Sequence, residues 1–84
     1  MTGRRDERDE DRQMIDPGRD LVAEKIQDRE AWELRRQGTL IGIVWREDRK
    51  TFRAAFERSE TMTQIPRTFP SIEEAARALD RTVR

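Results

Sequence analysis

The sequence predicts an α+β fold, in which a small antiparallel sheet of three to four strands packs on a C-terminal helix, after a short N-terminal helix and a disordered N-terminal tail. Three observations support this prediction. The first residues are almost all charged, which is typical of a solvated tail. The middle of the chain has β-branched and aromatic runs separated by polar turns. The end has a capping serine followed by apolar residues at helical spacing.

The tail is predicted over residues 1–17 and a single small domain over residues 18–84. Residues 4–12 are all charged and of mixed sign, so this segment has no apolar side chain to bury. Pro17 and Gly18 disfavour the continuation of regular structure and mark the boundary.

The first element of the domain is predicted to be a helix over residues 20–29. Asp20 is a suitable N-cap, and a narrow apolar stripe follows it, made of Leu21, Val22 and Ile26. Residues 31–37 can either continue this helix as far as Gly38 or form a strand. Their alternation of apolar and charged side chains favours the strand.

Three further strands are predicted, over residues 40–46, 51–58 and 62–69. Gly42 indicates a bulge or a close approach by another group. Pro66 places the last strand at an edge or at a bulge, because proline cannot donate to a strand ladder.

Ser71 is predicted to cap the C-terminal helix, with Glu74 completing a capping box. The small apolar stripe of this helix suits packing on a sheet, and the opposite sheet face is expected to be mostly polar and to carry arginines. The side chains predicted to line the covered face are Trp32, Leu34, Ile41, Ile43, Phe52, Ala54, Phe56 and Phe69.

Composition excludes several functions. The chain has no cysteine and no histidine, so disulfides, thiol chemistry, the usual zinc sites and the usual general base are excluded. No enzymatic activity, cofactor, metal or small-molecule substrate is predicted. No apolar run is long enough to cross a bilayer, so we expect no membrane partner and a cytoplasmic protein.

Arginines on the predicted exposed sheet face indicate DNA as the preferred partner, because arginine binds both guanine edges and phosphates. The 18 basic and 18 acidic residues cancel over the whole chain, so this prediction depends on where the arginines lie. The predicted nucleic-acid-binding residues are Arg35, Arg46, Arg53, Trp45 and Arg67.

Three segments, residues 42–46, 52–56 and 67–80, resemble the sheet-and-helix DNA-binding domain of plant ethylene-response factors and are similar to the arm-binding domain of phage tyrosine integrases. The most specific part is the Thr-Phe-Pro-Ser-Ile-Glu-Glu-Ala-Ala run in the last segment. In those families the sheet enters the major groove. The resemblance therefore implies DNA contacts by Arg46, Arg53, Trp45 and Arg67.

The alternative is a protein-binding regulator, such as an adaptor, an antitoxin-like protein or an inhibitor encoded by a phage or another mobile element. A small core, a charged tail and a neutral overall charge suit a protein that is completed by a partner protein or by a homodimer. Exposure of Trp45 distinguishes a contact surface from core packing.

Overall fold

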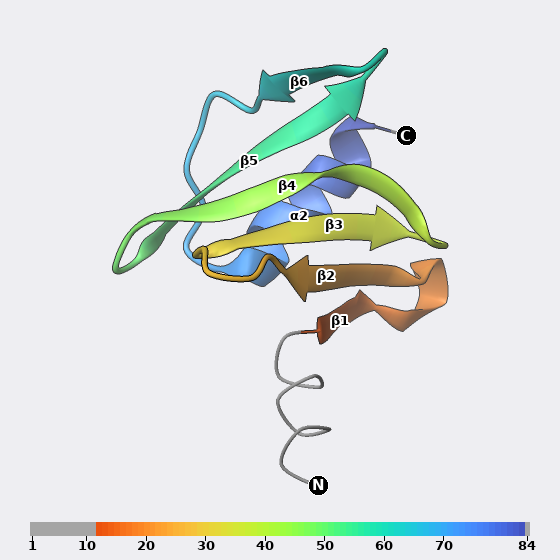
Figure 1. Ribbon diagram of the computed structural model, residues 1–84, viewed down its shortest axis with the longest axis horizontal. Helices are drawn as coiled ribbons and strands as arrows, with labels where there is room; N and C mark the ends of the chain where they lie inside the picture. Colours follow the sequence, from red (N-terminus) through yellow and green to blue (C-terminus); the bar gives the residue numbers. More distant parts are fainter. Residues whose placement is uncertain (1–11, 84) are drawn as a thin grey trace, which may run out of the picture.

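The computed structural model of the protein describes residues 12–83 (Figure 1). Its strands are β1 (Arg12–Asp16), β2 (Leu21–Lys25), β3 (Ala31–Arg36), β4 (Thr39–Asp48), β5 (Thr51–Arg58) and β6 (Thr61–Gln64). A 3₁₀ turn, η1 (Pro17–Arg19), joins the first two strands, and the helix α2 (Ile72–Thr82) ends the described chain.

The six strands form one antiparallel meander in which each strand pairs with the next one in the sequence. The helix α2 crosses one face of this sheet and packs mainly on β4 and β5 (Figure 1). The predicted α+β class, the antiparallel sheet and the C-terminal helix are confirmed. The predicted number of strands, three to four, is too low.

The strand β2 stands where the N-terminal helix is predicted, so that prediction is wrong. Leu21 and Ala23 belong to the core beneath α2, whereas Val22 is buried outside that core. An apolar triplet that is covered on both sides suits an inner strand, while a helix buries a single stripe. Asp20 adopts the left-handed conformation, with φ of 53°, and ends η1 instead of capping a helix.

The strand β1 uses residues that the sequence placed in the tail. Within it Ile15 is only 3% exposed and joins the core, although it follows a long charged run. The remainder of the predicted tail, residues 1–11, lies outside the described residues.

The strand β3 settles the alternative at residues 31–37 in favour of a strand. Trp32 and Leu34 are buried and their neighbours are partly exposed, which is the alternation expected of a half-buried strand.

A bulge in β4 changes which of its side chains face the helix. Leu34 pairs with Gly42 but Arg35 pairs with Leu40, so Ile41 is the additional residue. Ile41 belongs to the core as predicted, whereas beyond the bulge Val44 lies in the core and Ile43 does not. The predicted core position of Ile43 is therefore wrong, because simple alternation does not include the extra residue.

Gly42 confirms the prediction of a close approach beside a bulge. A Cβ atom added there would lie 2.7 Å from Cδ1 and 2.8 Å from Cδ2 of Leu79, and closer still to the carbonyl oxygen of Ala55. The missing side chain therefore allows α2 to sit directly on β4.

The last predicted strand, residues 62–69, is shorter in the structure. The strand β6 ends at Gln64, before Pro66, and the chain then returns to β5 through an isolated bridge between Phe52 and Phe69. Ser71 caps α2 as predicted, since its hydroxyl accepts from the Glu74 amide at 3.2 Å. The helix turns Ala75, Ala76 and Leu79 onto the sheet.

Candidate functional site

The sheet has one face that α2 does not cover, called the open face below. Strand register assigns residues to it, because side chains alternate between the two faces and cross-strand partners share a face. Val44 and Ala54 are partners within the core, so their neighbours Ile43, Trp45, Arg53 and Ala55 point the other way. The described residues assigned to the open face in this way include Arg12, Met14, Val22, Glu24, Glu33, Arg35, Ile43, Trp45, Glu47, Arg53, Ala55, Glu57 and Met62.

The open face has an apolar centre. Val22 and Ala55 are 5% and 6% exposed although no helix covers them, which means that neighbouring side chains shield them. Ile43, the direct partner of Ala55, is partly exposed, as is Trp45. The two exposed large apolar side chains in residues 12–83, Met14 and Met62, lie on this face at the two outer strands. Ile43, Trp45 and Ala55 therefore form the apolar centre of this face on β4 and β5. Val22 on β2 is separated from this centre by Glu33 and Arg35 of β3.

A cluster of charged side chains borders the apolar centre on β1, β2 and β3. The guanidinium of Arg35 lies 3.1 Å from a carboxylate oxygen of Glu33 and 3.4 Å from one of Glu24. Arg12 reaches the same Glu24 at 3.7 Å. On β4 and β5, Arg53 pairs with Glu47 at 2.5 Å through Nε, and a second contact at 3.4 Å makes the pair bidentate. Each arginine assigned to the open face therefore already has a carboxylate partner.

The structure brings together three of the five residues predicted to bind nucleic acid. Trp45 and Arg53 are direct cross-strand partners, and Arg35 lies on the same face. Arg46 follows Trp45 in β4 and therefore points to the opposite side. Its guanidinium lies 5.0 Å from the ring centroid of Phe52 and donates to the Arg49 carbonyl at 3.0 Å.

Arg67 is also away from the open face. It lies in the segment between β6 and α2, with its guanidinium 4.9 Å from the ring centroid of Phe69, a core residue. Arg46 and Arg67 are thus stacked on aromatic rings of the covered side, and the five predicted residues do not form one surface. Adjacent residues of a strand point to opposite faces, so the sequence alone already indicated that Trp45 and Arg46 cannot share one surface.

Sequence reasoning missed three apolar members of the open face, because it placed Val22 in a helix and Ile43 in the core and assigned Met62 to no face. It did place Ala55 on the same side of the predicted strand as Arg53 and Glu57. Two signals were present: the apolar triplet at residues 21–23, which suits a strand covered on both sides, and Gly42, which marks the bulge that turns Ile43 outward.

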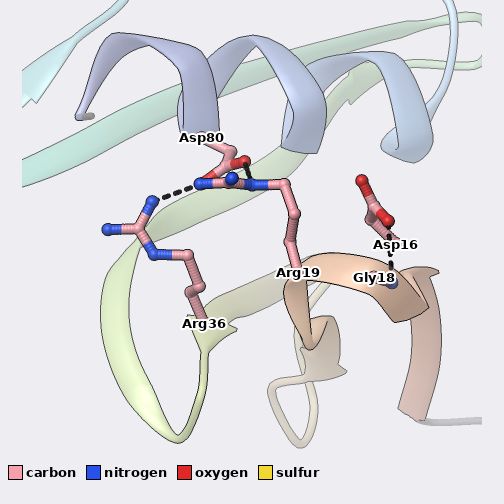
Figure 2. A network of polar contacts seen from close by, with 5 residues as sticks. All are labelled: Asp16, Gly18, Arg19, Arg36 and Asp80. Atoms are coloured by element: carbon pink, nitrogen blue, oxygen red, sulfur yellow. Dashed lines mark hydrogen bonds and ion pairs between the residues drawn. The ribbon is translucent and has the colours of Figure 1, made fainter.

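A second polar arrangement lies at the other side of the sheet. Asp80 of α2 is 2% exposed, and its carboxylate accepts from Nε of Arg19 at 2.5 Å and from Nη1 of Arg36 at 2.7 Å (Figure 2). Burial alone would raise the pKa of Asp80, but hydrogen bonds from Arg19 and Arg36 and their positive charges outweigh burial and hold this pKa below its usual range. These contacts fasten the last turns of α2 to η1 and β3. Asp80 is therefore a structural anchor that the sequence did not reveal.

Metal-binding clusters and membrane-spanning helices are both absent from residues 12–83. Within residues 12–83 no group of three or more acidic side chains is placed to hold a metal ion. No helix in this part of the chain is long and apolar enough to cross a membrane. The fold and its site thus define a small α+β domain with one covered and one open sheet face.

Comparisons of the chain with protein-family models, with curated proteins and with solved structures found no match. The resemblance to sheet-type DNA-binding domains therefore stays a prediction from the sequence.

Proposed function

We propose that this chain is a small protein-binding module whose open face docks a partner protein around Trp45. The observation that supports this proposal is the partly exposed Trp45 on a sheet face whose centre is apolar. Aromatic anchors beside apolar surface, with a charged border, are the usual composition of a protein interface.

The position of Trp45 in the fold supports this role. It belongs to β4, the longest strand, which pairs along its length with β3 and β5, and whose other face is held by α2. An anchor on such a rigid element loses little conformational freedom on binding, which favours affinity. Arg53 and Glu47 beside it add a polar pair to the border of the same surface.

The charges on the open face favour protein over DNA. The three arginines assigned to it, Arg12, Arg35 and Arg53, are matched by four glutamates, Glu24, Glu33, Glu47 and Glu57. Phosphate contacts would require the arginines to leave their carboxylate partners, and the glutamates would repel the phosphate backbone. A protein surface with its own mixed charges carries no such penalty.

Photo-crosslinking from two adjacent positions tests the proposal. A benzoylphenylalanine residue replaces Trp45 in one variant and Arg46 in the other, so the two probes lie on the same strand but on opposite faces. In cells of the natural host, we expect the probe at position 45 to crosslink a specific protein that the probe at position 46 does not label. Equal labelling from both positions would contradict docking on the open face.

A DNA titration forms the second arm of this test. We expect no steep salt dependence of binding to mixed duplex DNA, because every arginine that the described residues 12–83 place on the open face has a carboxylate partner. Binding that weakens steeply as salt rises, and that is lost in Arg53→Glu, would replace the protein proposal with the DNA prediction.

A further inference from the structure

The two edges of the sheet are protected to different degrees. The edge strand β1 has a bulge at Ile15 and begins with the charged Arg12, and both features discourage pairing with another strand. The edge strand β6, Thr-Met-Thr-Gln, has no charge, no proline and no bulge, and its four residues are all exposed. In a chain that is 43% charged, this is an unusually unprotected edge.

The hydrogen-bonding groups of β6 alternate between β5 and the free edge. The Ile65 amide donates to the Ala54 carbonyl at 2.8 Å, so Thr63 and Thr61, at steps of two, also direct their backbone groups to β5. Met62 and Gln64 therefore present their N–H and C=O groups outward. These four groups are a template for one more antiparallel strand.

We propose that two copies of this chain pair through β6, antiparallel and centred on Thr63. In this register Met62 of each copy lies opposite Gln64 of the other, and all outward groups of the two strands are used in four hydrogen bonds. A register centred on Gln64 would place Met62 opposite Pro66, which has no N–H. A register centred on Met62 would place Gln64 opposite Glu60, which is in a turn with φ of 65°.

Charge at the ends of β6 also fits a second copy. Glu60 precedes the strand and Arg67 follows it, and neither forms an ion pair among the salt bridges found in residues 12–83. Antiparallel pairing brings Glu60 of each copy toward Arg67 of the other, so opposite charges meet at both ends. On the symmetry axis Thr63 faces its own copy, and cross-strand threonine pairs are favourable in sheets.

The dimer would have a continuous sheet with its two open faces on the same side, because the two-fold axis is perpendicular to the sheet. Of the strands that the structure describes, only the protected β1 edges would remain free. This inference does not depend on the proposed function, since pairing through β6 leaves Trp45 and the apolar centre of each open face uncovered.

Sedimentation equilibrium of the full chain tests the pairing. Because a four-residue edge buries little surface, we expect the dimer to appear within a range of roughly 10 μM to 1 mM. Thr63→Lys places two like charges opposite each other on the axis and should weaken the dimer on the order of tenfold, as should Thr63→Asp. Gln13→Lys, on the β1 edge, is the matched control and should leave the dimer unchanged.

Mixing the two Thr63 variants separates disrupted pairing from disrupted folding. Lysine of one variant then faces aspartate of the other, so the mixture should form a tighter dimer than either variant alone. A wild-type chain that stays monomeric over the whole range would overturn the inference. So would a dimer that is unaffected by Thr63→Lys, or a mixture that associates no more tightly than either variant alone.

Discussion

Gly42→Ala probes the closest contact between the sheet and α2. The new Cβ would stand 2.7 Å and 2.8 Å from the two methyl carbons of Leu79 and still closer to the Ala55 carbonyl oxygen. Leu79 is 0% exposed and cannot turn away into solvent, and the Ala55 oxygen belongs to a strand that is paired on both sides. The substitution therefore overpacks the core, which typically costs about 1–3 kcal/mol.

The assay is thermal denaturation followed by tryptophan fluorescence, because Trp32 lies in the core and its emission changes when the core unfolds. For a domain of this size, a loss of 1 kcal/mol lowers the melting temperature by roughly 4–8 °C. Gly18→Ala is a suitable control, since its Cβ would meet only the Asp16 side chain, at an ordinary 3.5 Å.

A double-mutant cycle with Leu79→Ala sharpens this prediction. Leu79→Ala alone should cost about 2–5 kcal/mol, because it leaves a cavity at a fully buried position. Combined with Gly42→Ala, the total should be less than the sum, since the shortened side chain removes part of the clash and the new methyl fills part of the cavity. Additive losses, or a neutral Gly42→Ala, would refute the close seating of α2 on β4.

Three other predictions concern the helix. Leu79→Asp should unfold the domain, at a cost above roughly 4 kcal/mol for an unpaired buried charge, as circular dichroism would show. Ser71→Ala should cost about 1 kcal/mol by removing the cap of the Glu74 amide, measured by urea unfolding. Asp80→Asn should be less stable than wild type at pH 7. Folding lowers the pKa of Asp80, so the charged carboxylate stabilises the fold fully at any pH above the pKa of this group in the unfolded chain, near 3.9. This stabilisation is lost as the pH falls through the pKa of Asp80 in the folded protein. The free energies of unfolding of wild type and Asp80→Asn should therefore converge in acid.

Local signals predicted the elements that depend on neighbouring residues. The serine cap of α2, the strand at β3 and the close approach at Gly42 were all predicted from a few adjacent residues, because caps, alternation and a missing side chain are local properties. Asp80 shows the limit of this reasoning. Its partners Arg19 and Arg36 are 61 and 44 residues away, so the sequence alone did not identify it as a buried anchor.

The errors also had physical causes. Residues 20–29 contain an apolar stripe that suits a short helix, but pairing with β1 and β3 overrode that local preference. The bulge at Ile41 then moved Ile43 from the core to the open face. Since these two segments supply Val22 and Ile43, the same errors hid the apolar character of the candidate site.

The most direct test of the proposed function is the affinity of the crosslinked partner protein for two single variants. By isothermal titration calorimetry, Trp45→Ala should weaken binding by about 30-fold or more, the loss of roughly 2 kcal/mol expected for a central aromatic anchor. Arg46→Ala, one residue along the same strand but on the other face, should change the affinity less than about twofold. Equal losses in the two variants, or a loss confined to Arg46→Ala, would contradict docking on the open face.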